Sequence, residues 1–389
     1  MTKIFTDASD VPKPPEEVRI PLQAIRGRGA ATAMAHRFVR DAREVVDDGW
    51  NHRPWQQDAA DAAEQAPALA TRVHLETARS ALCVNDSPDI FFELSVNPYR
   101  GCEHGCIYCY ARPTHSYLNF SPGLDFETQI IAKQNIAQLL RDELCAPRYV
   151  PRLLNIGSAT DCYQPVEREL QLTRSLIEVM RDARHPFSLI TKSSGVERDL
   201  DLLAPLAAQR LAAVYVTITT LDPALARRME PRAAAPHRRL RTIRALADAG
   251  VPVGVSVAPQ IPFITEDMEQ VLQAAYEAGA RSAFYTVLRL PWELDTLFRE
   301  WLQVHYPQRA ARVMARVQDL HNLTDAQRGA GKTYNSDFVS RMKGSGLWAD
   351  LVRQRFATTC RKLGLNRERV ELDLAQFQPG LLRGQSSLF

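Results

Sequence analysis

Apolar residues recur along the middle of the chain in two alternating patterns. Short runs rich in β-branched residues have the length of buried strands, and the stretches between them carry apolar residues at helical spacing. The predicted strands are Ile90–Val96, Leu153–Ile156, Phe187–Thr191, Ala213–Thr220, Val253–Ala258 and Ala283–Leu290. The predicted helices are Glu127–Leu144, Val166–Ala183, Arg198–Arg210, Ala235–Ala249, Glu266–Ala278 and Trp292–Val304.

This alternation predicts an α/β fold built on a parallel sheet, because parallel neighbours need a crossover helix between them. Six units favour a (β/α)6 partial TIM barrel, since a closed eightfold barrel typically needs about 250 residues. A doubly wound open sheet would give the same alternation. The pattern alone leaves both arrangements open.

The flanks of this core differ from it in pattern. We expect an N-terminal extension at residues 1–87, a core domain at 88–304, and a basic helical region with a tail at 305–389. Weak helical patterns in the extension cover Ala31–Val46 and Asp58–Ala81, and Arg26–Ala30 has the composition of a flexible loop.

Composition changes this picture little. The chain has 389 residues, of which 45% are hydrophobic, and a formal charge of +3, too balanced to indicate a nucleic-acid-binding protein by itself. It has no apolar run of about 18 residues, and its first residues lack the apolar segment of a secretory signal. We therefore expect a cytoplasmic protein without a membrane span.

Three cysteines lie directly after the first predicted strand. Cys102, Cys106 and Cys109 have the spacing C-x3-C-x2-C, and a loop at that place belongs to the face on which β/α barrels build their active sites. Thiolates bind zinc or iron–sulfur clusters. A zinc site needs a fourth ligand, which His104 or His115 could supply. A [4Fe–4S] cluster held by three cysteines instead keeps one iron open for a small molecule.

With Tyr108 before the last cysteine, this motif resembles the signature C-x3-C-x-aromatic-C of the radical S-adenosylmethionine (SAM) superfamily. The resemblance implies that SAM chelates the open iron of a [4Fe–4S] cluster. It also implies that an electron from a donor such as flavodoxin or ferredoxin cleaves SAM to a 5′-deoxyadenosyl radical.

Further segments resemble the branch of this superfamily related to spore photoproduct lyase: Gly157–Glu167, Leu189–Ser193, Val216–Leu240 and Gly250–Glu266. The segments Arg26–Ala30 and His36–Phe38 resemble uncharacterised bacterial proteins of the same branch. The resemblance implies a DNA substrate and lyase-like DNA repair, or another nucleic acid as substrate.

Carried over by position, the resemblance implies a role for each motif residue. Tyr108 would lie near the adenine, the segment with Ser158 and Asp161 would meet the methionine amino group, and Lys192 would meet its carboxylate. Thr217 or Thr219 would bind the ribose, and Ala258 would line the adenine. Cys102, Cys106 and Cys109 would ligate the cluster. Each position follows or ends a predicted strand, which places them on one rim. An ordinary exposed lysine is the alternative at Lys192.

One position departs from the lyase pattern. The lyase has a hydrogen-donating cysteine where this chain has Ser158, and a hydroxyl is a poor hydrogen-atom donor. Cys162 is the candidate replacement, with an inert buried cysteine as the alternative. The departure puts reversal of a thymine dimer in doubt, although not the radical initiation.

Two basic segments bear on the substrate. Arg227–Arg244 has seven arginines, and Arg341–Val370 has eight Lys and Arg against two Asp and Glu. Both fit either solvated helix faces or a surface for a polyanion. The C-terminal Gln385, Leu388 and Phe389 resemble the motif by which bacterial proteins bind the sliding clamp, with a tail docked on its own domain as the alternative.

Our leading hypothesis is therefore a radical SAM enzyme acting on DNA or RNA. The same radical chemistry on a protein or a small metabolite is a second hypothesis. A zinc-stabilised DNA-binding module without catalysis is the third.

Overall fold

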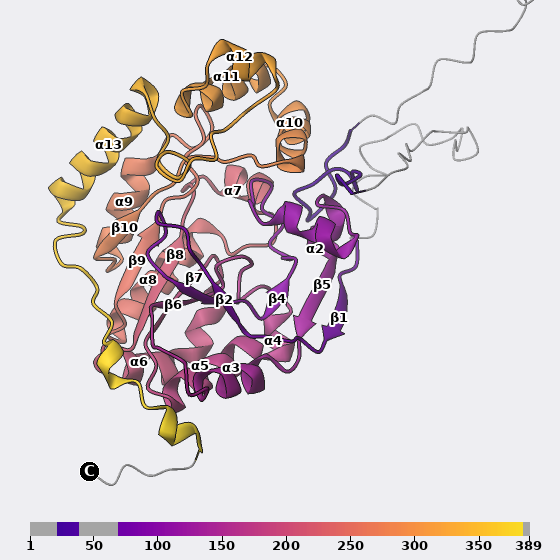
Figure 1. The fold of residues 1–389 in the computed structure, drawn as a ribbon. Helices are drawn as coiled ribbons and strands as arrows, with labels where there is room; N and C mark the ends of the chain where they lie inside the picture. The colour runs from indigo at the N-terminus through magenta and orange to yellow at the C-terminus, as the bar shows by residue number, and fades with distance from the viewer. Residues whose placement is uncertain (1–21, 39–68, 384–389) are drawn as a thin grey trace, which may run out of the picture.

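The computed structural model describes residues 22–38 and 69–383 (Figure 1). Within them, six parallel strands form one sheet in the order β10-β9-β8-β7-β6-β3, and β2 (Leu82–Val84) pairs antiparallel with β3 at its edge. The parallel strands are β3 (Leu94–Val96), β6 (Leu154–Ile156), β7 (Phe187–Thr191), β8 (Ala212–Thr217), β9 (Val253–Ser256) and β10 (Ser282–Phe284).

This strand order confirms the partial barrel. Each strand pairs with the next parallel strand in the sequence, so the order never reverses as it does in a doubly wound sheet. The two ends of the sheet, β2 and β10, do not pair with each other, so the barrel is open.

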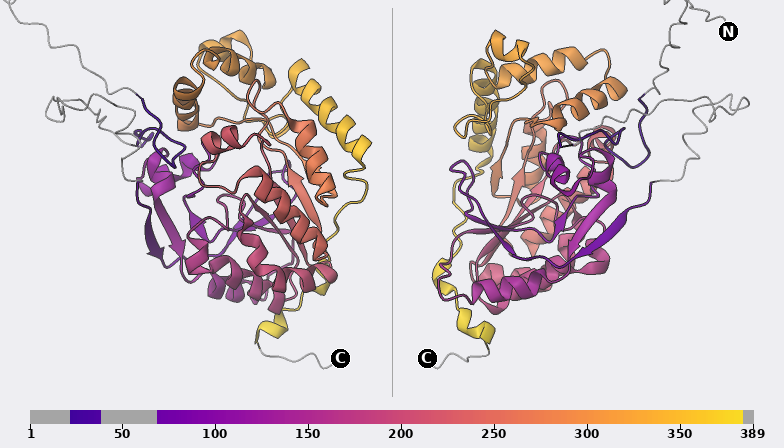
Figure 2. Two further views of the ribbon diagram at one scale, coloured as in Figure 1. Left: turned by 180° about the vertical axis from the view of Figure 1, so that it is seen from behind. Right: turned by 45° about the vertical axis from the view of Figure 1, so that its right-hand side comes forward.

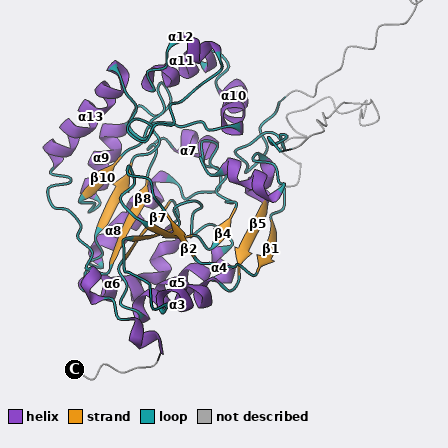
Figure 3. Ribbon diagram, in the orientation of Figure 1, coloured by secondary structure: helices purple, strands orange, loops and turns teal. Residues whose placement is uncertain are grey.

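Helices cover the outer face of the curved sheet (Figures 2 and 3). They are α3 (Ile136–Leu144), α5 (Leu172–Asp182), α6 (Leu200–Ala208), α8 (Pro236–Asp248) and α9 (Met268–Glu277), and α10 (Glu293–His305) follows β10. Shorter helices are α2 (Leu124–Thr128), α4 (Glu167–Leu170), α7 (Pro223–Met229), η1 (Arg112–Leu118) and η2 (Ser194–Asp199).

Strand alternation separates the core from the barrel interior. On β8, Val214 and Val216 are fully buried in the hydrophobic cluster beneath the helices, whereas Tyr215 and Thr217 face the interior and line a cavity. Side chains on one strand alternate between faces, so each strand contributes to both.

Part of the predicted helix Glu127–Leu144 is wrong. Residues 129–133 form β5 (Gln129–Lys133), which pairs with β1 (Arg72–Glu76) on one side and β4 (Tyr99–Arg100) on the other. The sequence QIIAK has adjacent β-branched residues and is buried from Ile130 onward, so pairing on both edges outweighs its helical spacing.

The helices predicted in the N-terminal extension are also wrong where the structure describes them. The described residues of Ala31–Val46 and Asp58–Ala81 contain no helix, and Arg72–Glu76 is a strand of the small second sheet. The segment assigned to the extension therefore supplies β1 and β2.

The C-terminal region contains α11 (Ala310–Leu320), α12 (Asp325–Gly329) and α13 (Leu347–Leu363), followed by η3 (Leu374–Gln376) and η4 (Pro379–Arg383). In Figure 1, α11 and α12 lie beyond the strand ends, while η3 and η4 return to the opposite end of the barrel. Among the helices in the described ranges, none combines the length and apolar character needed to cross a bilayer.

Candidate active site

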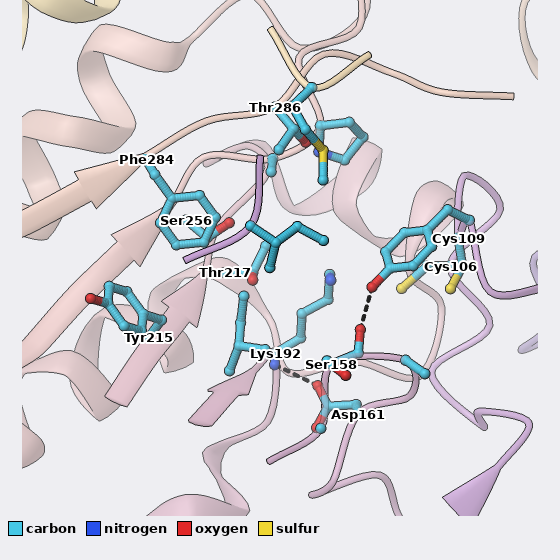
Figure 4. Close-up of a pocket in the computed structure, with 18 of the residues that line it drawn as sticks. Cys106, Cys109, Ser158, Asp161, Lys192, Tyr215, Thr217, Ser256, Phe284 and Thr286 are labelled. Carbon is cyan, nitrogen blue, oxygen red and sulfur yellow. Dashed lines mark hydrogen bonds between the residues drawn. The ribbon is translucent and has the colours of Figure 1, made fainter. Parts of the chain in front are cut away.

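The predicted site residues meet at the carboxyl ends of the parallel strands. A cavity of about 360 Å³ opens there between the strand ends and the loops that follow them (Figure 4). Of the residues predicted for the site, those that line it are Cys102, Cys106, Tyr108, Cys109, Ser158, Asp161, Lys192, Thr217 and Ala258. Thr219 and Cys162 are buried beside the cavity and do not line it.

The three thiols lie on one loop at one end of the cavity. Cys102 and Cys106 are buried, and Cys109 is partly exposed. Burial raises the pKa of Cys102, and it raises the pKa of Cys106 to about 12 even though Lys192 opposes the shift. These two thiols therefore keep their protons until a metal displaces them.

A buried ion pair fixes the cysteine loop. The Arg112 guanidinium donates to the carbonyls of Gly105 and Cys106 at 3.0 and 2.8 Å, and it pairs with Glu127. Both side chains are fully buried. Arg112 thus satisfies the Gly105 carbonyl and gives a second donor to the Cys106 carbonyl, which also accepts from the Cys109 N–H at 3.2 Å, and Glu127 balances its charge.

The predicted flexible loop Arg26–Ala30 packs against this pair. The backbone N–H groups of Gly29 and Ala30 each donate to the Glu127 carboxylate at 2.9 Å, and Arg28 donates to the Glu127 carbonyl at 2.8 Å. A Cβ at Gly29 would overlap the carbonyl oxygen of Gly105. The segment therefore needs glycine at position 29 to reach the cysteine loop, and the expectation of a flexible loop is wrong for it.

Asp161 joins three loops at the cavity wall. Its carboxylate accepts bonds from the Thr191 hydroxyl and the Lys192 N–H, each at 2.7 Å, and lies 3.3 Å from His104 Nδ1. Burial alone would raise the pKa of Asp161, but His104 and these donors outweigh it and hold the pKa below its ordinary value. With its oxygens engaged by protein donors, Asp161 positions the loops rather than facing the cavity with a free carboxylate.

Tyr108 and Thr219 belong to a second buried network. Both hydroxyls bond to Glu230, which pairs with Arg239, and Arg239 also donates to the Thr217 carbonyl at 2.9 Å. Burial would raise the pKa of Glu230, but Arg239 and Lys192 lower it to about 2. The ionised carboxylate thereby ties the cysteine loop to the end of β8.

Cys162 does not reach the cavity. It is fully buried in the hydrophobic core, and its sulfur lies below Gly157, where a Cβ would approach it to 2.9 Å. Gly157 has φ of +83°, so glycine both relieves the backbone and leaves space for this sulfur. Cys162 is therefore a buried cysteine, as in the alternative considered above, and is not a candidate hydrogen donor.

The two histidines considered as zinc ligands are engaged elsewhere. His104 pairs with Asp161, and His115 Nε2 lies 3.0 Å from the Gln129 carbonyl, away from the cavity lining. In the part of the chain that the structure describes, no three His, Cys, Asp or Glu side chains are grouped as ligands of a single metal ion.

Several cavity residues were not predicted from the sequence. Asn155, Tyr215, Ser256 and Phe284 point into the barrel from the strands, and Arg289, Met342 and Lys343 reach the cavity from later loops. Strand alternation could have grouped Tyr215 with Thr217. Nothing in the local pattern indicates that Met342 and Lys343, in the C-terminal region, come to this cavity.

Some of the basic side chains considered for a polyanion form internal ion pairs. In the first segment, Arg232 pairs with Glu103, Arg238 with Glu197 and Arg239 with Glu230. In the second, Arg341 pairs with Asp89 and Arg355 with Glu269, both at 2.7 Å. The charges of these five arginines are therefore balanced within the fold.

Residues 96–275 match the sequence model of the radical SAM superfamily. This range contains the three cysteines and every other cavity residue carried over from the family motif. This part of the chain is therefore similar to radical SAM domains.

Relatives of the radical SAM domain occur in distant organisms. An uncharacterised protein of Mycobacterium tuberculosis is 38% identical over 224 residues, which cover 57% of this chain and 66% of that protein, just under two thirds of its length. An uncharacterised protein of Methanocaldococcus jannaschii is 26% identical over 213 residues, covering 55% of this chain and 76% of that protein.

Among solved structures, a variant of spore photoproduct lyase has a TM-score of 0.50 at 14% identity, with 75% of this chain and 80% of that chain covered. At this identity the match supports a shared fold, in agreement with the open barrel described above.

Replacing Gly29 with alanine tests the packing on the cysteine loop. The added methyl group would overlap the Gly105 carbonyl, so we expect Gly29→Ala to lower the free energy of unfolding by about 1–3 kcal/mol in urea titrations. Gly329→Ala is the control, because no atom lies within 4 Å of the added Cβ. Equal unfolding midpoints for the two variants would contradict the close approach.

Replacing Glu127 with glutamine tests the buried ion pair. The amide keeps the shape but leaves Arg112 without a counter-charge, so Glu127→Gln should cost about 3–5 kcal/mol of unfolding free energy. Asp201→Asn is the matched control, since Asp201 pairs with Arg174 but is 57% exposed, and it should cost about 1 kcal/mol or less. A small cost for Glu127→Gln would mean that the pair does not hold the loop.

Proposed function

We propose that this protein is a radical SAM enzyme in which Cys102, Cys106 and Cys109 hold a [4Fe–4S] cluster. The observation that carries the proposal is the set of three thiols at one end of a cavity that continues past Lys192. A tetrahedral zinc site needs a fourth ligand, and the two candidates, His104 and His115, are engaged by Asp161 and the Gln129 carbonyl, whereas a [4Fe–4S] cluster with three cysteine ligands keeps one iron for SAM.

The chain's own residues would position the cofactor. When bound, the cluster and SAM supply the chemistry of the reaction, since an electron from a donor such as flavodoxin or ferredoxin cleaves SAM to methionine and a 5′-deoxyadenosyl radical. Lys192 would bind the carboxylate of SAM, and Ser158, Thr217, Ala258 and Tyr108 would surround the rest of it. The enclosing loops would exclude water from the reacting groups.

We further propose a nucleic acid as the substrate, through lyase-like repair or base modification. The resemblance of the motif segments to the branch of spore photoproduct lyase supports this class. Two cations of the cavity lining, Arg289 and Lys343, support an anionic substrate.

Formation of 5′-deoxyadenosine tests the proposed chemistry. Anaerobically reconstituted protein with dithionite and SAM should release 5′-deoxyadenosine, measured by chromatography, and the amount should rise when irradiated or unmodified DNA is added. Analysis of the recovered DNA for reverted or altered bases identifies the outcome. Absence of 5′-deoxyadenosine from protein with a full iron content would refute the radical chemistry.

Replacing Cys106 with alanine tests the ligand set. Because two thiolates cannot replace three, Cys106→Ala should lower bound iron and visible absorbance after reconstitution and abolish formation of 5′-deoxyadenosine. Cys83→Ala is the control, because Cys83 is exposed on β2 and does not line the cavity. A full cluster in Cys106→Ala would remove this cysteine from the proposed ligands.

A further inference from the structure

A hydrophobic cluster connects the cysteine loop to the outer surface of the protein. Cys106, Ile107 and Tyr108 pack in one buried cluster with residues of α7, α10 and α11 (Figure 1), among them Trp301. The Ile107 N–H donates to the carbonyl of Met229, the last residue of α7, at 3.0 Å. The outer face of these helices is therefore a surface from which a partner could approach the thiols without entering the cavity.

Four exposed arginines lie on this face. They are Arg227 and Arg228 at the end of α7, and Arg309 and Arg312 at the start of α11. Tyr306, which follows α10, connects the two pairs, because Arg228 Nη1 donates to its hydroxyl at 3.1 Å and its carbonyl accepts from the Arg309 N–H at 2.9 Å. Arg309 and Arg312 are three residues apart and so lie on one side of the helix. The four residues form one basic surface, which we call the arginine surface.

Acidic side chains do not neutralise the arginine surface. In the part of the chain that the structure describes, none of its four guanidinium groups forms an ion pair. The acidic residues at the two ends of α7 are engaged elsewhere: Glu230 pairs with the buried Arg239, and Asp222 accepts from two backbone N–H groups in the first turn of the helix. Burial lowers the pKa of His305, and the charge of Arg228 lowers it further. The surface therefore carries a positive charge that attracts an acidic partner.

The arginine surface is separate from the cavity. None of its arginines belongs to the cavity lining, which at the open side of the barrel comes from Asp89–Phe92 and from Met342 and Lys343. A substrate has to enter the cavity, so a surface outside it suits a partner that delivers something to the cysteine loop. An electron donor is such a partner, because an electron can reach the thiols through the hydrophobic cluster and does not need the cavity.

We propose that the arginine surface docks an acidic one-electron donor protein that reduces the cluster. The inference rests on the proposed function and names the place where its electron donor binds. The donor loses one electron and the cluster gains it, and no bond forms or breaks. Electron-transfer partners use small interfaces steered by charge, which fits four arginines on one face. A polyanion such as DNA could also bind a basic surface, so DNA binding is measured with the same variants.

Calorimetry with oxidised flavodoxin, an acidic one-electron donor, measures docking apart from the chemistry. The anaerobically reconstituted protein should bind it with an affinity that falls as NaCl is raised, since salt screens exposed charges. Arg227→Glu/Arg228→Glu should bind about tenfold more weakly or worse at low salt. Arg361→Glu/Lys362→Glu is the control, because it makes the same change in charge at exposed positions at the end of α13, and it should keep the wild-type affinity. Equal affinity in the two double variants, an affinity that salt does not change, or no binding to the wild type would overturn the proposal.

Fluorescence anisotropy with a labelled DNA duplex tests the polyanion. The two double variants should bind the duplex equally, because the proposal assigns the arginine surface to the electron donor. A loss of DNA affinity in Arg227→Glu/Arg228→Glu as large as its loss of flavodoxin affinity would assign the surface to a polyanion and overturn the proposal. Arg309→Glu, on the other helix, should also weaken flavodoxin binding, and it keeps the test decisive if the double variant on α7 does not fold.

The choice of reductant separates this proposal from the proposed function. With reduced flavodoxin, Arg227→Glu/Arg228→Glu should form 5′-deoxyadenosine about tenfold more slowly than the wild type. With dithionite the two proteins should form it at the same rate, because a small reductant needs no docking surface. A wild type that forms none with dithionite contradicts the proposed function. A double variant that matches the wild type with both reductants refutes the docking surface alone.

Discussion

The site depends on one buried ion pair, between Arg112 and Glu127. The cysteine loop turns through Gly101 and Gly105, both with positive φ, and its buried carbonyls lie outside the regular hydrogen-bond ladders of helices and strands. Arg112 supplies donors to those carbonyls, and its charge requires a buried carboxylate. Glu127 in turn has acceptor capacity left over, which the backbone of Gly29 and Ala30 fills. The N-terminal segment is therefore part of the electrostatic balance of the loop, although it is far from it in sequence.

A second buried ion pair, between Glu230 and Arg239, restricts the cysteine loop in the same way. It connects Tyr108 in the cysteine loop to the end of β8, and it is as fully buried as the first pair. Neither pair is a strong source of net stability, because desolvation offsets much of the attraction. Their effect is geometric, since breaking either leaves an uncompensated charge and so disfavours any other arrangement of the loop. A loop that must present three thiols to one cofactor benefits from such a restriction.

The sequence predicted the parts of this molecule that local patterns encode. All six parallel strands were found, and Phe187–Thr191 matches β7 residue for residue, because buried β-branched runs between helices have few other interpretations. Contacts between distant segments were not predictable. The QIIAK segment forms a strand because β1 and β4 pair with it. The sequence pattern indicated surface charges at Arg232 and Arg239, whereas both pair with buried carboxylates. The cavity residues Met342 and Lys343 likewise come from a region whose own pattern is helical and basic.

The cavity also constrains how a reaction there could end. Within the described part of the chain its lining includes Cys102, Cys106 and Cys109 and no other cysteine, and all three are proposed to bind the cluster. Cys162 is separated from the cavity by the Gly157 turn, and the sequence resemblance implies that Ser158 replaces the hydrogen-donating cysteine of the lyase. Within residues 22–38 and 69–383, no thiol apart from the three proposed cluster ligands is therefore in position to return a hydrogen atom to a substrate radical. The proposed chemistry would share its initiation with the lyase branch and differ in its final step, in which 5′-deoxyadenosine would return the hydrogen atom to the substrate radical and become the 5′-deoxyadenosyl radical again.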